Sequence, residues 1–167
     1  MQTVRIAGVV KESIVDGDGL RLTVFTQGCP HRCPGCHNPG THDFDGGYDC
    51  DIDNILKEID KNPLLKGVTF SGGEPLCRAG ELLPLARGIR SRGKDIWCYS
   101  GYTFAELLEM ASRDPDLSAL LELIDVLVDG PFLQAEKDLT LRFRGSRNQQ
   151  VLDLPRSLAA GEAVPIL

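Results

Sequence analysis

The chain has 167 residues, enough for one domain with a real hydrophobic core but with little room for a second. A hydrophobic fraction of 42% and a charged fraction of 25% are typical of a soluble globular protein, and a formal net charge of -6 argues against a general affinity for nucleic acid or an anionic membrane. No apolar run is long enough to cross a bilayer, and residues 1–6 have the pattern of a strand rather than of a signal sequence. We therefore expect a single cytoplasmic domain spanning 1–167.

Predicted strands and helices alternate along the chain, and apolar spacing identifies them; in 51–61, for example, every isoleucine falls on one helical face. In chain order we predict a strand over 4–10, a turn at 16–19, a strand over 21–26, a helix over 51–61, a strand over 67–70, a helix over 80–92, a strand over 95–98, a helix capped by Thr103 with Glu106 in a capping box, a helix over 117–123, a strand over 125–128 and a possible strand over 139–143. This alternation favours parallel β/α units, and the chain is too short for an eight-fold barrel of about 250 residues. The predicted fold is therefore α/β: a short partial (β/α) barrel with a curved, mostly parallel sheet.

Three cysteines stand in the loop that follows the strand over 21–26. Three residues separate Cys29 from Cys33, and two separate Cys33 from Cys36. A four-iron cluster takes four ligands, so three thiolates from the protein would leave one iron open to another molecule, as reactive metal sites require.

A structural zinc ion is the alternative for these cysteines, with a fourth ligand from His31, His37 or Cys50. Disulfides are not expected because no signal sequence directs the chain to an oxidising compartment. Of the other thiols, we expect Cys98 to lie in the core and Cys77 to be packed.

The unusual residues of the chain all follow predicted strands. Active sites of parallel α/β folds lie at the carboxyl ends of the strands, so these residues should converge on one edge of the sheet. They are the three cysteines, the Gly72-Gly73-Glu74 segment, the pair Tyr99-Ser100, and Asp129.

The segment from Ser71 to Pro75 combines two glycines with a carboxylate. Glycines allow a ligand to approach the backbone closely, and carbonyls with a carboxylate suit an ammonium group. A plain strand-to-helix turn with a solvated Glu74 is the alternative. The segment lacks the Lys-Ser/Thr ending of a phosphate-binding loop. With the cysteines, it suggests an α-amino acid ligand whose amine and carboxylate chelate the open iron.

Together these motifs resemble the radical S-adenosylmethionine enzymes, whose hallmarks are a Cys-x3-Cys-x2-Cys loop and a Gly-Gly-Glu motif. Within that superfamily the chain is similar, from about Gly8 to Val151, to the activating proteins of anaerobic ribonucleoside-triphosphate reductase. The segments that carry this likeness are 16–21, 27–29, 35–38, 99–103, 125–132 and 144–149.

The resemblance implies a cofactor set and a reaction. Cys29, Cys33 and Cys36 would hold a [4Fe-4S] cluster, and S-adenosylmethionine would bind its open iron. Reductive cleavage would give a 5′-deoxyadenosyl radical that makes a glycyl radical on the large subunit of the reductase, with the electron coming from a low-potential donor such as flavodoxin or ferredoxin. A glycine-bearing loop of the reductase would enter through the open side of the partial barrel.

The resemblance also implies roles for further residues. Gly72, Gly73 and Glu74 would bind the methionine amine. Other candidates for cofactor binding are His37, which follows the third cysteine where the subgroup often has an aromatic residue, then Tyr99, Ser100 and Asp129 for the methionine or the ribose hydroxyls, and Arg144 and Asn148.

Three alternatives remain open from the sequence. The chain could activate another glycyl-radical enzyme of the pyruvate formate-lyase type, or act on a free small molecule. It could also be a metal-binding or electron-transfer module without catalysis. His31 and His42 are expected to be loop residues, and Arg142, Arg144 and Arg147 form either a solvated basic face or a dock for an acidic partner.

Overall fold

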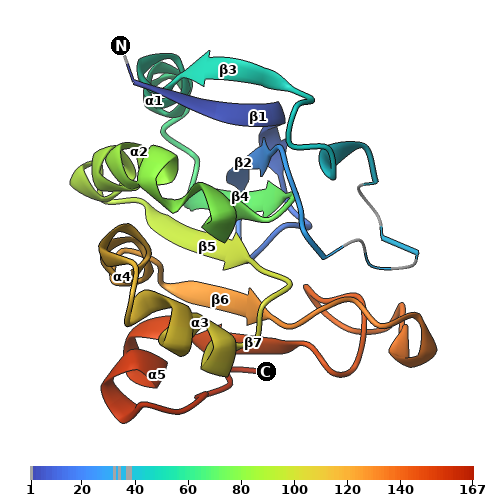
Figure 1. The fold of residues 1–167 in the computed structure, drawn as a ribbon. Helices are drawn as coiled ribbons and strands as arrows, with labels where there is room; N and C mark the ends of the chain where they lie inside the picture. The colour runs from blue at the N-terminus through green and yellow to red at the C-terminus, as the bar shows by residue number, and fades with distance from the viewer. Residues whose placement is uncertain (1, 32, 34, 37–38) are drawn as a thin grey trace.

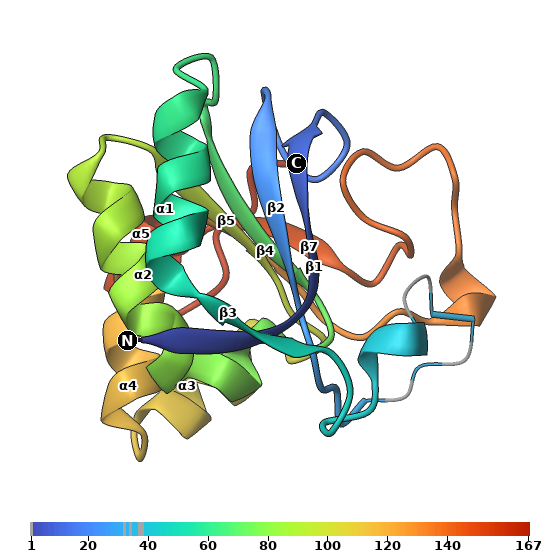
Figure 2. The same cartoon turned by 90° about the horizontal axis from the view of Figure 1, so that it is seen from above.

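The computed structural model describes residues 2–31, 33, 35–36 and 39–167, and it contains a seven-stranded sheet whose described α-helices all lie against one face (Figures 1 and 2). The strands are β1 (Thr3–Ser13), β2 (Arg21–Thr26), β3 (Tyr48–Asp51), β4 (Gly67–Gly72), β5 (Asp95–Tyr99), β6 (Val126–Asp129) and β7 (Gln150–Asp153). The α-helices are α1 (Ile52–Lys61), α2 (Ala79–Ser91), α3 (Phe104–Ala111), α4 (Pro115–Leu121) and α5 (Leu154–Ala160), with short 3-10 helices at Pro39–Thr41, Pro75–Arg78 and Gln134–Glu136.

The strand order is β3-β1-β2-β4-β5-β6-β7. The pairs β2–β4, β4–β5 and β5–β6 are parallel, whereas β1 and β7 run antiparallel to their neighbours. Five of the seven strands therefore point the same way, because β3 is antiparallel to β1 and so is aligned with β2. The predicted α/β class with a mostly parallel sheet is confirmed; the sheet ends at β3 and β7 and is not closed.

The predicted elements between residues 4 and 128 are confirmed, with their ends displaced by only a few residues. The capping box is present, since Glu106 N donates to Thr103 Oγ1 at 3.2 Å and Thr103 N donates to Glu106 Oε1 at 3.0 Å. In α1 the isoleucines at 52, 55 and 59 are buried, as the apolar spacing predicts.

The predicted strand over 139–143 is wrong. These residues form turns and bends, in which Asp138 accepts the Thr140 amide at 2.9 Å and Phe143 has a left-handed backbone with φ 67°. Such a backbone cannot continue a strand ladder. The last strand is β7, which the sequence analysis missed together with β3 and α5.

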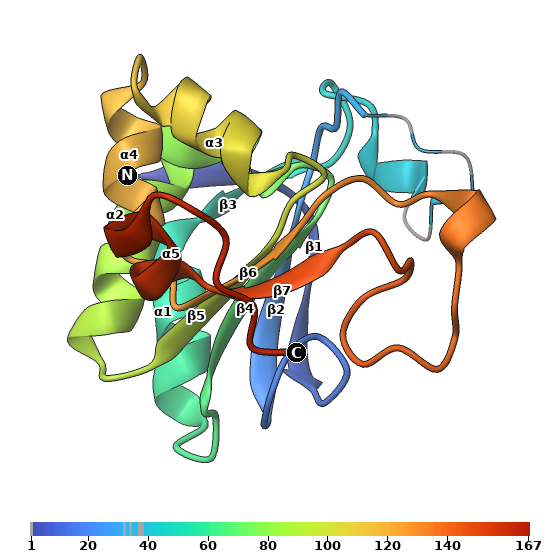
Figure 3. The same ribbon diagram turned by 90° about the horizontal axis from the view of Figure 1, so that it is seen from below.

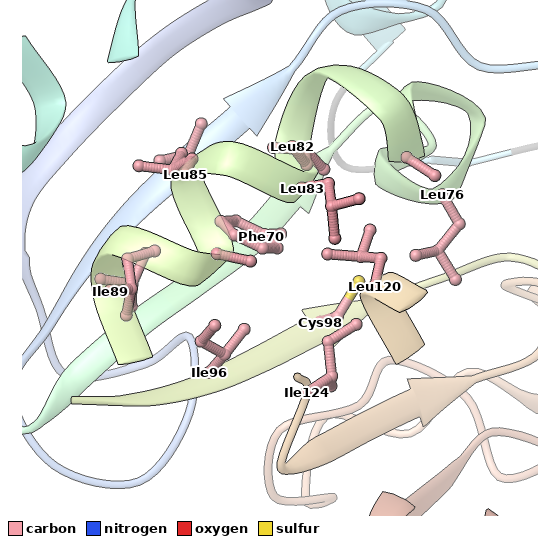
Figure 4. Close-up of a cluster of buried hydrophobic side chains, with 14 of the residues drawn as sticks. Phe70, Leu76, Leu82, Leu83, Leu85, Ile89, Ile96, Cys98, Leu120 and Ile124 are labelled. Atoms are coloured by element: carbon pink, nitrogen blue, oxygen red, sulfur yellow. The ribbon is translucent and has the colours of Figure 1, made fainter. Parts of the chain in front are cut away.

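The main core lies between the sheet and the helices (Figure 4). Phe70 and Ile96 from the strands are fully buried against Leu82 and Ile89 of α2. Cys98 lies in this core and is fully buried, as expected. Burial of each large aliphatic side chain stabilises the fold by roughly 1.5–3 kcal/mol. The packed layer therefore holds the strands, and with them their ends, in position.

The opposite face of the sheet carries a smaller cluster built on Trp97, Val128 and Val151, with Phe143 packed against it. Alternation along β5 explains the two faces, since Trp97 points away from the helices while its neighbours Ile96 and Cys98 point toward them. The chain between β6 and β7 crosses this helix-free face (Figure 3). No helix in the described part of the chain is long and apolar enough to span a membrane.

Candidate functional site

One cavity of about 670 Å³ opens on the helix-free face at the carboxyl ends of the parallel strands. Its walls include seven residues predicted for the site, which come from the loop after β2 and from the ends of β4 and β5 with the loops that follow them: Cys29, Cys33, Cys36, Gly72, Gly73, Tyr99 and Ser100. Segments that lie up to 71 positions apart in the sequence therefore meet in one place, as the topology predicts.

Backbone hydrogen bonds hold the cysteine loop beside the glycine loop. The Glu74 amide donates to the Gly28 carbonyl at 2.7 Å, and the Gly73 amide donates to the Thr26 carbonyl at 2.8 Å. On the other side of the cysteine loop, the Cys29 amide donates to the His42 carbonyl at 3.1 Å. Main-chain hydrogen bonds thus fix the Gly28-Cys29 segment to both neighbouring segments.

The two glycines are required by this close approach. A Cβ atom at Gly73 would lie 2.4 Å from the Gly28 carbonyl oxygen, and one at Gly72 would lie 2.7 Å from the Thr26 nitrogen. Gly72 also has φ 96°, a conformation that favours glycine. The cysteine loop approaches Gly73 and the end of β2 approaches Gly72, while the predicted approach of a ligand to this backbone stays a prediction.

The carboxylate of Glu74 is fully buried and accepts hydrogen bonds from several groups. Oε1 accepts from the Gly101 amide at 2.8 Å, Oε2 accepts from the Leu76 amide at 3.1 Å, and the Ser100 hydroxyl lies 3.0 Å from both oxygens. His31 completes the set, with its Nε2 at 2.6 Å from Oε1. Glu74 does not line the cavity; it joins the loops that do.

His31 has a larger structural role than the sequence analysis expected. Besides its contact with Glu74, its ring packs edge-on against Tyr102, with the ring centroids 4.5 Å apart. A Cβ atom at Gly101 would lie 2.4 Å from the His31 ring, so this glycine leaves room for the histidine. His31 therefore anchors the cysteine loop between Cys29 and Cys33.

Tyr99 and Asp129 lie in different surroundings. Tyr99 lines the cavity, and burial, followed by the charge of Asp16, raises the pKa of its phenol, which stays a neutral donor. The Asp129 carboxylate accepts from the amides of Phe104 at 2.8 Å and Gln150 at 3.1 Å, and it lines a second, adjacent cavity instead. Burial raises the pKa of this carboxyl despite those two hydrogen bonds.

Arg144 lines the main cavity, whereas Asn148 lines the second one. Nη1 of Arg144 donates to the Gln149 carbonyl at 2.8 Å, and its buried Nε has no partner among the described residues. The Asn148 amide donates to the Pro131 carbonyl at 2.7 Å. His37 lies outside the described residues.

The donor set fits an iron–sulfur cluster bound through three ligands. Cys29, Cys33 and Cys36 are free of disulfides and line one cavity. Among the described residues, no three histidine, cysteine or acidic side chains are close enough to hold a single metal ion. Cysteine thiolates are the usual ligands of iron–sulfur clusters, and three of them would leave one iron of a four-iron cluster open.

Comparison with known proteins agrees with this donor set. The cysteine loop at the end of a parallel strand identifies an iron–sulfur protein of the 4Fe-4S single cluster domain class, whose family model matches residues 15–152. Similar relatives are the anaerobic ribonucleoside-triphosphate reductase-activating proteins of three sources. The Vibrio cholerae protein is 39% identical over 83% of this chain and 90% of its own, and the Escherichia coli K12 protein is 38% identical over 83% of this chain and 91% of its own. The Enterobacteria phage T4 protein is 32% identical over 82% of this chain and 86% of its own. The chain belongs to the family of anaerobic ribonucleoside-triphosphate reductase-activating proteins, which confirms the resemblance predicted from the motifs.

Proposed function

We propose that this protein activates anaerobic ribonucleoside-triphosphate reductase by generating a glycyl radical on it. The observation that carries the proposal is the cavity shared by the three cysteines and the Gly72-Gly73 turn, in a chain whose relatives carry that name. When bound, the [4Fe-4S] cluster would supply the electron that splits S-adenosylmethionine into methionine and a 5′-deoxyadenosyl radical. That radical would take a hydrogen atom from a glycine Cα of the reductase, leaving the glycyl radical and 5′-deoxyadenosine.

The first task of this chain is to hold the cluster through Cys29, Cys33 and Cys36. Two contacts fix the loop around Cys29, the proposed first ligand. One is the hydrogen bond from the Cys29 amide to the His42 carbonyl, and the other is the contact of His31 with Glu74. A loop held at these points loses less conformational entropy when the cluster binds.

The second task is to orient S-adenosylmethionine. We propose that carbonyl oxygens of the Gly72-Gly73 turn accept the methionine amine and that Tyr99 donates to its carboxylate or to the ribose hydroxyls. Ser100, whose hydroxyl hydrogen is directed at Glu74, would accept from a ribose hydroxyl. Glu74, whose oxygens already accept several hydrogen bonds, would act mainly by holding the glycine turn, Ser100 and the cysteine loop in register.

Three residues at the margins of the cavity have proposed supporting roles. Arg144 carries a guanidinium on the cavity wall and suits the methionine carboxylate. Asp129 and Asn148 would act indirectly, because their hydrogen bonds hold the backbone of α3, β7 and Pro131 around the site. We also propose that His37, which follows the third cysteine in the sequence, lies next to the adenine.

The open sheet also has a proposed role. We infer that it works as a partial barrel whose missing side is covered by the reductase when the target glycine enters. A low-potential donor such as flavodoxin or ferredoxin would deliver the electron, and cysteines that form no disulfide suit the proposed cytoplasmic location, which is reducing.

Anaerobic reconstitution tests the proposal. The wild-type protein should bind about four irons per chain and, once reduced, release 5′-deoxyadenosine from S-adenosylmethionine. Cys33→Ser should lose both properties, whereas Cys50→Ser, at a thiol outside the cavity, should keep both. A Cys33→Ser protein that still held four irons and cleaved S-adenosylmethionine would overturn the ligand assignment.

A further inference from the structure

We propose that Ile14, Val15 and Leu139 form a preformed apolar docking lip for the glycine-bearing segment of the partner enzyme. Val15 and Leu139 line the cavity, and Ile14 adjoins Val15. The inference rests on the proposed function, because it identifies how the polypeptide substrate of that same cavity is held.

Exposure of the three side chains is the first observation. Leu139 is 84% exposed, Ile14 is 75% exposed and Val15 is 72% exposed. Only one other described large hydrophobic side chain, Leu64, exceeds 70%. Single exposed aliphatic residues are common on protein surfaces, but Val15 and Leu139 come from segments 124 positions apart and line one cavity, with Ile14 next to Val15 in the chain.

An ion pair joins the two segments that carry the lip. An ion pair joins Arg142 Nη2 to Asp18 Oδ1 at 3.7 Å, linking the β1–β2 turn to the chain between β6 and β7. In Figure 3 that chain crosses the helix-free face from the neighbourhood of the cysteine loop to the β1–β2 turn. The cysteine loop and the β1–β2 turn therefore lie near opposite ends of that chain segment, and residues of both line the cavity.

The first side of the lip is rigidly held. The Asp16 carboxylate accepts from Ser13 Oγ at 2.6 Å and Thr23 Oγ1 at 3.2 Å, and its carbonyl accepts from Thr69 Oγ1 at 2.7 Å. Arg21 Nη1 donates to the Asp18 carbonyl at 2.9 Å. Ile14 and Val15 are thus presented to solvent by a fixed turn.

The second side is held in the same way. The Asp138 amide donates to the Gly145 carbonyl at 3.1 Å, and Asp138 Oδ1 accepts from the Thr140 amide at 2.9 Å. Phe143 packs edge-on against Trp97 with ring centroids 5.0 Å apart. Leu139 stands on the turn between these anchors. Preorganised apolar contacts lose little entropy on binding and so contribute more of their burial to affinity.

The chemistry of the substrate explains why such a lip is needed. Glycine has no side chain, so a protein that selects one glycine must contact the backbone and the side chains that flank it. An apolar lip suits flanking aliphatic or aromatic side chains, and its burial on docking would exclude water from the reacting carbon.

The experiment compares Val15→Ser/Leu139→Ser with wild type and with the control Leu64→Ser, whose residue is similarly exposed but does not line the cavity. The probe is the purified reductase subunit without its radical. We expect the double variant to bind it at least about tenfold more weakly, and its ratio of glycyl radical to 5′-deoxyadenosine to fall by a similar factor, while Leu64→Ser matches wild type. Leu139→Ser alone, on an exposed turn, should show a smaller loss of the same kind.

Three results would overturn the proposal: unchanged affinity and radical ratio in the double variant, an equal loss of 5′-deoxyadenosine and of glycyl radical, or an unchanged affinity for the reductase with loss of self-association in sedimentation. The last would assign the lip to a second copy of this chain. If wild type itself releases no 5′-deoxyadenosine, the proposed function fails, and the reductase-binding comparison still decides whether the lip docks the partner.

Discussion

His31 Nε2 lies 2.6 Å from Glu74 Oε1, and this contact joins the cysteine loop to the Gly-Gly-Glu segment 43 positions away. A backbone hydrogen bond from the Glu74 amide to the Gly28 carbonyl, at 2.7 Å, joins the same two segments. The cysteine loop and the Gly-Gly-Glu segment are therefore one connected structure, in which the glycine segment positions the cysteine loop.

Replacement of His31 by leucine should loosen the cysteine loop. A hydrogen bond to a buried carboxylate contributes about 1.5–3 kcal/mol, so we expect iron loss to a chelator to be roughly ten to a hundred times faster. His31→Gln, whose amide can donate to the same oxygen, should retain the cluster much better. The account of His31 fails if both variants lose iron at the wild-type rate.

Replacement of Glu74 by glutamine should destabilise the protein. The new amide group would face donors from Ser100, Leu76 or Gly101, so the free energy of unfolding should fall by about 2–4 kcal/mol in urea titrations. Glu122→Gln, at an exposed position, is the control and should change it little. A Glu74→Gln protein of normal stability that binds S-adenosylmethionine weakly would instead favour direct contact with the amine.

Gly73→Ala should displace the cysteine loop. The added methyl would stand 2.4 Å from the Gly28 carbonyl oxygen, so the hydrogen bond from the Glu74 amide to that oxygen must break or lengthen. We expect a lower melting temperature and incomplete iron incorporation. Gly8→Ala, where no atom lies within 4 Å of the new methyl, should fold and load normally. Full iron loading of Gly73→Ala would contradict the close packing of the two loops.

Thiol reactivity should distinguish the cysteines outside the cluster. Cys77, expected to be packed, is exposed in the structure, although burial of its sulfur raises the pKa of its thiol. Its alkylation in the cluster-loaded protein should therefore be slow near neutral pH and accelerate as pH rises, because the thiolate forms only at higher pH. Cys98 is fully buried and its thiol pKa is raised further by burial, so it should react only after unfolding. Comparable labelling of both by mass spectrometry would disprove this burial pattern.

The sequence predicts which strands carry the site, because the position of these strands depends on local patterns and on topology. Apolar periodicity located β2, β4, β5 and β6, and parallel strands place their carboxyl ends at one edge. Cys29, Gly72 and Tyr99 consequently line one cavity.

The remaining features depend on contacts between distant segments. Tyr48–Asp51 becomes β3 because it pairs with β1, since its own four residues are largely polar. The His31 contact with Glu74 has no local signal, as it exists only once two loops meet. Apolar residues in 139–143 suggested a strand, but they serve a turn that covers the helix-free face and leaves Leu139 exposed.

The most direct test of the account is an electron paramagnetic resonance spectrum of the reduced, cluster-loaded protein mixed with S-adenosylmethionine and the anaerobic ribonucleoside-triphosphate reductase subunit. The account predicts a glycyl-radical doublet on the reductase that is absent when Cys33→Ser replaces the wild-type protein. Release of 5′-deoxyadenosine without any doublet on the reductase would contradict the proposed activation of this partner.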